Sequence, residues 1–506
     1  MSLRYCLIVT LTGLGIAGLG ALGGCPPDDG VPDGNSPPDG NTPVEKTDHE
    51  RFLTEVVPGG YEGPATCQIC HADVAADLLE SGHWQWAGAS VNIVGHETET
   101  HGKRDLLNNF CIAVPSNEGR CAQCHPSYGW KDDTFDFTST AQVDCFICHD
   151  TTGTYAKHPT DGGGGGAAAL VNEGQVTVVG PDELQQVAYK VGPPTRRNCG
   201  FCHFYAGGGD NVKHGDMSSD LASPTREMDV HMGGLDFACQ ECHTEQNHGI
   251  AGFALHSVNE GGAAPACTRC HGDTDVHTAN PPVDPLLNAH LARVACETCH
   301  IPAFARSKPT KVAWYWDTAG QDISPIPTDE LGQPTYDKQK GTFVWAKGVQ
   351  PEYRWHNDLW RRMIIGVSDT YTVAGTAEDP VVIAEPAATK DDADAKIYPF
   401  KKMVGRQPAD TLAKRLSVPH LFGTAGGANP YWVEFDWGLA LADGAAYTGI
   451  PFTGTYGFPE TVMYLKVSHE VAPKEMALGC EACHGVPAFW AAVGLKDPLP
   501  GPPKPE

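Results

Sequence analysis

The most constraining feature of this 506-residue chain is a five-residue pattern, Cys-x-x-Cys-His, that occurs eight times. Two thiols at this spacing can attach a haem covalently, and the adjoining histidine can bind its iron as an axial ligand. Zinc sites, redox dithiols and disulfides also use paired cysteines, but none of them requires a histidine directly after the second cysteine. The pattern therefore predicts eight covalently attached haem c groups. Attachment is predicted at Cys67, Cys70, Cys121, Cys124, Cys145, Cys148, Cys199, Cys202, Cys239, Cys242, Cys267, Cys270, Cys296, Cys299, Cys480 and Cys483, with axial ligands at His71, His125, His149, His203, His243, His271, His300 and His484.

Eight haems leave little protein for each one. If the chain is cleaved before Cys25, about 480 residues remain, or roughly 60 per haem, so much of the interior must be porphyrin. The 58 Gly and 40 Pro are typical of a loop-rich chain, and no clear run of alternating strands indicates a sheet. We therefore predict a mainly α fold with extensive irregular structure, in which the polypeptide wraps around a chain of eight haems.

The N-terminus predicts export. Arg4 precedes a glycine-rich apolar stretch over residues 7–24, and Cys25 follows it in a pattern that resembles a bacterial lipoprotein cleavage box. An uncleaved anchor is the alternative, and both interpretations put the haem region on the periplasmic or cell-surface side. We expect a lipoprotein-type signal peptide at 1–24, a disordered tether rich in Pro, Gly and Asp at 25–50, a haem-rich region with seven motifs at 51–300, a Trp-rich haem-free packing region at 301–479, and the eighth motif with a C-terminal tail at 480–506.

The charge of the chain limits its partners. A formal net charge of -27 argues against nucleic acid and against anionic membrane surfaces, so membrane attachment is expected only through the N-terminal lipid. An anionic substrate would need a local basic group that opposes this field. The candidates for that group are Lys103, Arg104, Arg120, Arg196 and Arg197, with solvated surface charge as the alternative role for most of them.

The histidine count allows every haem to have two histidine ligands. Of 22 histidines, eight lie in the motifs, and 22 minus 8 leaves 14 for the second position. A cytochrome with eight such irons would only transfer electrons. Second ligands are predicted at His83, His231, His248, His256, His290, His420 and His469, with His158, His214 and His277 as weaker candidates.

The cysteine count leaves one thiol over. Of 19 cysteines, 16 lie in the motifs, Cys6 lies in the signal peptide and Cys25 is the proposed lipid site. The remaining thiol is Cys111, ten residues before the second motif. By count alone, an inert buried residue is favoured over a reactive one.

Several stretches outside the haem motifs resemble the octahaem tetrathionate reductase family. The resemblance extends over nearly the whole chain after the tether, and these stretches are much more specific than the haem motifs. The stretches are 109–118 (NFCIAVPSNE) running into the second motif, 148–155 (CHDTTGTY), 202–204 (CHF), 207–216 (GGGDNVKHGD), 229–232 (DVHM), 397–400 (IYPF) and 419–423 (PHLFG). The chain departs from the family pattern in a glycine-rich insertion before Val171 and in the tether.

The resemblance implies a reductase whose second haem, on Cys121 and Cys124, is catalytic. It implies Lys213 as a ligand of that iron, with Asp210 and Cys111 beside it. Whether Lys213 lies opposite His125 or displaces it is left open by the sequence. A lysine can bind iron only as the neutral amine, so its pKa must lie far below the usual value.

The predicted function is the reduction of tetrathionate, nitrite or hydroxylamine at the second haem, fed by seven haems with two histidine ligands. Cys111 would attack the central sulfur-sulfur bond of tetrathionate, whereas nitrogen substrates would need Asp210 as a proton source. Electrons would come from a redox partner protein or a quinol-linked donor. A non-catalytic electron conduit and a hydroxylamine oxidase with a tyrosine-linked porphyrin are the alternatives.

Overall fold

The computed structural model describes residues 47–158, 166–252, 264–279, 281–423 and 425–495. These residues belong to one compact unit that starts at Lys46. The predicted signal peptide, Cys25, nearly all of the tether and the candidate ligand His256 lie outside them. In the part of the chain that the structure describes, no helix has both the length and the apolar character needed to cross a bilayer.

Short helices carry residues of seven of the eight motifs, because a spacing of three residues puts both thiols on one side of a helical turn. The fifth motif lies on a 3-10 turn, η5 (Cys239–Glu241). The helices are α1 (Asp48–Glu55), α2 (Pro64–Leu79), α3 (Gly82–Gln85), α4 (Glu118–Cys121), α5 (Phe146–His149), α6 (Gln185–Tyr189), α7 (Arg196–His203), α8 (Thr268–His271), α9 (Asp284–His290), α10 (Cys296–His300), α11 (Tyr431–Glu434), α12 (Trp437–Thr448), α13 (Glu481–His484) and α14 (Pro487–Ala492).

The strands form one large sheet and four small ones. The small sheets contain β1 (Gly88–Ala89) with β2 (Thr100–His101), β3 (Tyr155–His158) with β4 (Ala167–Asn172) and β5 (Gln175–Val178), β6 (Glu245–Gln246) with β7 (Gly249–Ile250), and β15 (Ala409–Asp410) with β16 (Arg415–Leu416) and β17 (Tyr456–Gly457). The large sheet contains β8 (Thr310–Tyr315), β9 (Tyr336–Asp337), β10 (Gly341–Ala346), β11 (Glu352–His356), β12 (Trp360–Arg362), β13 (Val381–Pro386), β14 (Lys396–Arg406) and β18 (Glu460–Lys466).

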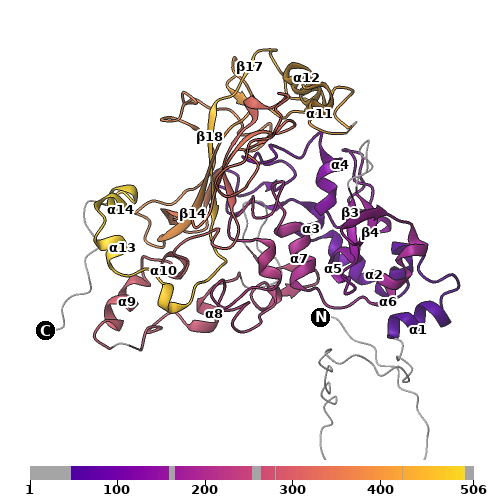
Figure 1. Ribbon diagram of the computed structural model, residues 1–506, viewed down its shortest axis with the longest axis horizontal. Coiled ribbons are helices and arrows are strands. Elements are labelled where there is room, and N and C mark those ends of the chain that lie inside the picture. The colour runs from indigo at the N-terminus through magenta and orange to yellow at the C-terminus, as the bar shows by residue number, and fades with distance from the viewer. Residues whose placement is uncertain (1–46, 159–165, 253–263, 280, 424, 496–506) are drawn as a thin grey trace, which may run out of the picture. The chain divides into compact units, whose positions relative to one another are not determined.

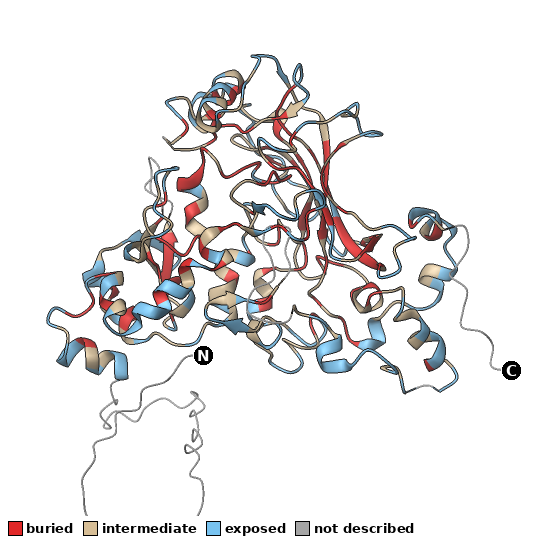
Figure 2. Cartoon of the chain, turned by 180° about the vertical axis from the view of Figure 1, so that it is seen from behind, coloured by how far each residue is buried: buried red, intermediate tan, exposed pale blue. Residues whose placement is uncertain are grey.

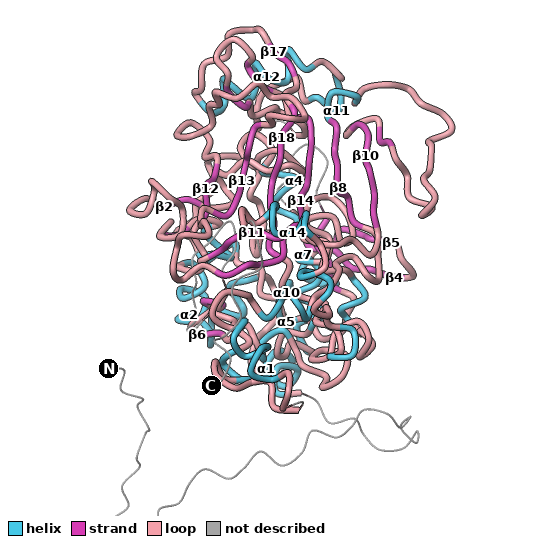
Figure 3. Tube along the Cα trace, turned by 90° about the vertical axis from the view of Figure 1, so that its left-hand side faces the viewer, coloured by secondary structure: helices cyan, strands magenta, loops and turns pink. Residues whose placement is uncertain are grey.

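The large sheet is mixed. Its order is β12-β13-β18-β14-β8-β10-β9, and β11 also pairs with β14. β13 runs parallel to β18 and β14 runs parallel to β8, while the remaining pairs are antiparallel. The strands of the large sheet lie side by side, and the motif-bearing helices α2, α5 and α7 lie outside the sheet (Figures 1 and 3). The region predicted to lack haem is therefore built mainly from this sheet.

The prediction that the chain has no sheet is wrong, and the mainly α class is not confirmed. Figure 2 shows the central strands as buried along most of their length. In β18, Val462, Met463, Tyr464 and Leu465 are buried in succession, so the strand lies under protein on both faces. A strand of this kind has a continuous apolar run and lacks the polar-apolar alternation by which a half-exposed strand is recognised.

The sheet also holds the two segments that carry Cys111 and Lys213. The Asn109 side chain donates to the Met403 carbonyl at 2.8 Å and accepts from the Thr461 hydroxyl at 2.7 Å. Lys401, which is fully buried in β14, donates from Nζ to the Val212 carbonyl at 2.6 Å. Phe110, Ile112 and Val212 pack into the same apolar core as the strands. Residues far apart in the sequence therefore meet on this sheet.

A truncation in the centre of the sheet tests how far the fold depends on it. Leu465→Ala removes a fully buried side chain from β18, and we expect it to lower the free energy of unfolding by about 2–5 kcal/mol. Leu412→Ala makes the same change where the side chain is 72% exposed, and it is expected to have little effect. Denaturant unfolding followed by circular dichroism measures both. Equal stability of the two variants would contradict the central place of β18.

Candidate haem array and active site

The described residues enclose a cavity of about 3170 Å³ that is lined by both cysteines of all eight motifs. Pockets for one small ligand are typically about 300–1,000 Å³, so this space is large enough for several groups. Seven of the eight motif histidines also line the cavity, and His125 is the one that does not.

Each of those seven motif histidines faces a second histidine. A metal-imidazole bond is about 2 Å long, so two imidazoles bound on opposite sides of one iron have ring centroids about 6 Å apart. The observed pairs match this spacing: His71 with His49 (6.3 Å), His149 with His248 (6.4 Å), His203 with His83 (6.1 Å), His243 with His469 (6.2 Å), His271 with His231 (6.0 Å), His300 with His277 (6.4 Å) and His484 with His290 (6.0 Å). The residues present therefore fit seven haems with two histidine ligands each.

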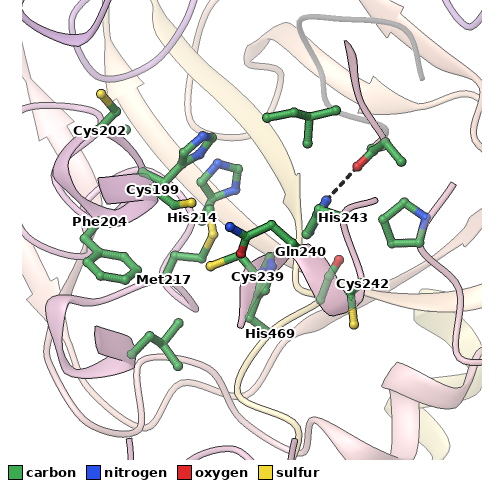
Figure 4. A pocket seen from close by; sticks show the side chains of 18 of the residues that line it. Cys199, Cys202, Phe204, His214, Met217, Cys239, Gln240, Cys242, His243 and His469 are labelled. Atoms are coloured by element: carbon green, nitrogen blue, oxygen red, sulfur yellow. Dashed lines mark hydrogen bonds between the residues drawn. The ribbon is translucent and has the colours of Figure 1, made fainter. Parts of the chain in front are cut away.

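Hydrogen bonds on the far ring nitrogen orient several of these imidazoles. Nδ1 of His243 lies 2.7 Å from the Ala251 carbonyl, shown as the dashed line in Figure 4, and Nδ1 of His149 lies 2.9 Å from the Gly192 carbonyl. Nδ1 of His469 is 3.3 Å from Asp216. A histidine that donates from Nδ1 presents Nε2 to a metal, and such outer contacts are usual for metal-bound histidine.

The structure pairs five of the seven predicted second ligands with a motif histidine: His83, His231, His248, His290 and His469. It also pairs two others. His277 was a weaker candidate, and His49 was missed because it lies in the segment that the sequence assigned to the tether. A helical signal was present there, since Thr47 caps α1 by accepting from the Glu50 amide.

His420 is in a different position from that predicted. Its ring is fully buried, with Nε2 3.1 Å from the Gly423 carbonyl and Nδ1 3.4 Å from Asp443, and it lies opposite none of the motif histidines in the described pairs. His214 lines the cavity near His469 without a paired motif histidine (Figure 4). His158 lies at the end of β3. Nearness to a motif in the sequence was thus a useful but incomplete guide.

The second motif differs from the others because its histidine is turned away from the cavity. His125 is fully buried, and its Nδ1 lies 2.7 Å from the Ser127 hydroxyl and its Nε2 2.5 Å from the Trp84 carbonyl. Burial holds the pKa of His125 well below its usual value, so the ring is neutral, with one nitrogen as donor and one as acceptor. Both nitrogens have protein partners. The prediction of His125 as an axial ligand does not fit this arrangement.

Aromatic rings and a buried lysine hold His125 in this position. The ring lies 4.7 Å from that of Trp130 and 5.2 Å from that of Trp84, with Phe135 and Phe137 also in contact. Lys157 donates from Nζ to the carbonyls of His125 and Ser127, and Asp144 lies 3.8 Å from the same Nζ. The turn after the second motif is therefore fixed from both sides.

Lys213 and Cys111 lie on the cavity wall next to this motif. Both line the cavity, and consecutive glycines separate them: a Cβ on Gly207 would lie 3.2 Å from Cβ of Lys213, and a Cβ on Gly208 would lie 3.7 Å from Sγ of Cys111. Both glycines have positive φ, which side-chain-bearing residues rarely adopt. Burial, together with Lys103 and Arg362, lowers the pKa of Lys213 to about 7, and Cys124 of the second motif acts on it in the opposite direction.

Cationic side chains surround Cys111. Burial raises the pKa of its thiol, and four cations nearby oppose this shift, namely Lys311, Lys103, Lys340 and Arg120. Lys103, Arg120 and Lys340 line the cavity. Of the five predicted basic residues, the structure thus brings Lys103 and Arg120 to the site. Arg104 packs over Phe137, Arg196 pairs with Asp236, and the Arg197 guanidinium lies beside Gly153.

Asp210 is not among the residues that line the cavity. Its carboxylate accepts from the Ser219 amide at 2.8 Å and from Lys308 Nζ at 2.7 Å, so it faces a polar network behind Lys213. The structure therefore brings two of the three residues suggested by the resemblance to the cavity.

Contacts between motifs indicate their order in space. Thiols of different motifs meet between Cys67 and Cys145, Cys124 and Cys202, Cys199 and Cys239, and Cys267 and Cys296. The Leu478 amide, just before the eighth motif, donates to the Cys299 carbonyl of the seventh at 2.9 Å. Motif neighbours in space are therefore first and third, second and fourth, fourth and fifth, sixth and seventh, and seventh and eighth.

Replacing His49 tests the histidine pairing. His49→Gln alters an exposed position on α1, so the fold should persist, while one of the haems loses an imidazole and becomes high-spin. His420→Gln is the matched control, because its ring faces none of the motif histidines in the described pairs. Electron paramagnetic resonance of the oxidised holoprotein measures the spin states. A high-spin signal in the control beyond that of the unchanged protein, or no added high-spin signal in His49→Gln, would contradict the pairing.

The comparisons with known proteins agree with this geometry. Residues 311–486 match a family model described as bacterial cytochrome c. An uncharacterised protein of Archaeoglobus fulgidus is 26% identical over 262 residues, which cover 42% of this chain and 82% of that protein. The crystal structure of octahaem cytochrome c from Shewanella oneidensis is 40% identical with a TM-score of 0.76, and the match covers 88% of this chain and 96% of that one. The haem motifs, the cavity and this similarity agree, and the chain belongs to the octahaem cytochrome c family, whose haem is bound covalently.

Proposed function

We propose that this protein is a multihaem reductase whose reaction centre is the second motif, with tetrathionate as the favoured substrate. Eight haems would be held by the eight motifs, seven of them between the histidine pairs. The observation that carries the proposal is the position of His125, whose two ring nitrogens have protein partners outside the cavity. A haem bound at Cys121 and Cys124 would lack the imidazole that the other seven sites supply.

Lys213 is the side chain that would serve as ligand in place of His125. Its side chain lines the cavity, and a pKa of about 7 leaves a substantial share of its amine neutral at neutral pH. Only the neutral amine has a lone pair for a metal. This arrangement supports displacement of His125 over a position of Lys213 opposite it, the two possibilities that the sequence left open.

Cys111 would supply the first chemical step with tetrathionate. Its thiolate attacks one of the two central sulfur atoms, the central sulfur-sulfur bond breaks, and one thiosulfate leaves with the bonding electron pair. The product on the protein is a cysteine S-thiosulfonate. When bound, the haems supply the two electrons that release the second thiosulfate and restore the thiolate.

The charges near Cys111 favour a sulfur oxyanion over neutral hydroxylamine. Lys103, Arg120 and Lys340 line the cavity of a protein with net charge -27, so they give a local attraction for a dianion. The same cations stabilise a thiolate. Nitrite and hydroxylamine have less support, because Asp210, the proton source suggested for them, is paired with Lys308.

An electron conduit is the second candidate. The seven histidine pairs and the close order of the motifs favour it, since such sites have no open position for a substrate. A function as a conduit alone would leave Lys213 on the cavity wall and the cations around Cys111 without a role. Export, lipid attachment at Cys25 and a protein or quinol-linked electron donor complete the proposal in either case.

Turnover by a cysteine variant tests the reductase. The holoprotein is reduced by viologen without oxygen, and its reoxidation is followed on adding tetrathionate, nitrite or hydroxylamine separately. We expect Cys111→Ala to lower the rate with tetrathionate by about 100-fold or more, since the nucleophile is lost. Its haem content is the check on folding. Undiminished turnover would exclude the thiol route, and no reoxidation of the unchanged protein by any substrate would favour the conduit.

A charge variant tests the recognition of an anion. Lys340→Gln removes a cation from the cavity wall, and we expect kcat/KM for tetrathionate to fall about tenfold at low ionic strength, with a smaller effect at high salt. Lys338→Gln is the matched control: both ammonium groups pair with an aspartate at 2.7 Å, Lys340 with Asp337 and Lys338 with Asp322, but Lys338 is not among the residues that line the cavity. Equal effects of the two changes would show that only the overall charge matters.

A further inference from the structure

Three side chains of types that can bind a metal lie together just before Lys103, a residue of the cavity wall, and apart from the haem motifs. His96, Glu99 and His101 each offer one ligand atom, and the three atoms lie within 4.8 Å of one another. His101 belongs to β2, and the other two lie in the turn just before this strand. The side chains of His96 and His101 are 16% and 9% exposed, and that of Glu99 is 44% exposed, so the cluster is open on one side.

The two imidazoles converge on one carboxylate oxygen. Oε2 of Glu99 lies 3.0 Å from Nδ1 of His96 and 2.6 Å from Nε2 of His101. The ligand atoms of a tetrahedral site with bonds of about 2.0 Å are about 3.3 Å apart. The cluster is therefore close to the geometry of three protein ligands with a fourth position open to water.

His101 has an unusual pair of neighbours. Its Nε2 faces Glu99, and its Nδ1 lies 2.6 Å from Oδ2 of Asp105. A neutral imidazole donates from only one nitrogen, so its other lone pair would face a carboxylate and be repelled. The contact is favourable only if the ring carries a second proton or if a cation lies between His101 and Glu99.

Asp105 is arranged as the outer partner of a metal-bound histidine. The Gly102 amide donates to Oδ1 of Asp105 at 2.8 Å, which leaves Oδ2 to receive the Nδ1 proton of His101. Nε2 of His101 is then free to bind a metal. Histidine ligands of zinc generally have such a carboxylate on the other ring nitrogen.

The backbone holds this loop rigidly. The His101 amide donates to the Ser90 hydroxyl at 2.9 Å, and the Ser90 amide donates to the Glu99 carbonyl at 3.0 Å. Both ends of the loop are fastened to the β12 region: the Val94 amide donates to the Trp360 carbonyl, and the Ile365 amide donates to the Asp105 carbonyl, each at 2.9 Å. The ligands therefore do not need to be gathered from a flexible segment.

We propose that His96, Glu99 and His101 bind a divalent transition-metal ion, with zinc as the best fit. Imidazole nitrogen suits zinc, copper and nickel, and two imidazoles with one carboxylate are a common zinc set. The ion would neutralise the carboxylate that faces His101. The same loop carries Lys103, which lies between His101 and Asp105 and whose ammonium is 3.6 Å from the centre of the Trp86 ring. Metal binding by the cluster does not require the reductase function.

Zinc binding to the holoprotein tests the site, because the haems already occupy the other paired histidines. The protein is stripped with a chelator, dialysed against buffered zinc, and analysed for zinc and iron by mass spectrometry. We expect one zinc for every eight irons, together with a higher thermal midpoint in the presence of zinc. Glu99→Gln and His101→Gln should lose the zinc and the rise in midpoint.

Glu97→Gln is the matched control, since Glu97 lies two residues from Glu99 but its side chain accepts from the Gly95 amide outside the cluster. It should retain zinc as the unchanged protein does. Haem content and the ultraviolet circular dichroism spectrum identify any variant that fails to fold. If either Glu99→Gln or His101→Gln fails, the zinc-dependent shift in the thermal midpoint is measured on the other one. Absence of stoichiometric zinc in the unchanged protein, or equal zinc in Glu99→Gln and Glu97→Gln, would overturn the proposal and assign the contacts to a protonated His101.

Discussion

The spacing of paired histidine rings at about 6 Å is the constraint on which the rest of this structure depends. It occurs seven times among the described residues, and each time one ring comes from a motif and the other from elsewhere in the chain. A flat ligand between two such rings fixes both segments at once. The motif-bearing region has several separate apolar clusters in place of one large core, so bound haem would add to the burial that holds its short helices and loops together.

The large sheet provides the other half of the architecture and connects it to the candidate reaction centre. Its strands bury Trp314, Phe400, Met403 and Leu465 and supply a conventional apolar core. Asn109 and Val212 are bonded to β14, so the segments that carry Cys111 and Lys213 are placed by a rigid scaffold. Hydrogen bonds to the sheet thus fix the segments of Cys111 and Lys213. Such support is an advantage for chemistry that needs two groups at a fixed separation.

The predictions succeeded where covalent chemistry leaves a local pattern and failed where burial removes one. Each motif is five consecutive residues, and all 16 cysteines of the eight motifs line one cavity. The sheet was missed because β18 is buried on both faces and lacks alternation. His49 was missed because composition suggested a tether, although it pairs with His71. His420 was predicted as a second ligand from the histidine count, but its ring nitrogens lie near Gly423 and Asp443.

The amino-acid sequence by itself determined the number of haem motifs. It also predicted an export signal, and it carried the resemblance that drew attention to Cys111, Asp210 and Lys213. These features depend on residues that are adjacent or nearly adjacent in the chain. Only the tertiary structure decided which histidines face each other, that His125 turns away from the cavity, and that Lys103, Arg120 and Lys340 gather near Cys111 while Asp210 pairs with Lys308. Contacts of this kind join segments separated by tens to hundreds of residues, and local spacing carries no information about them.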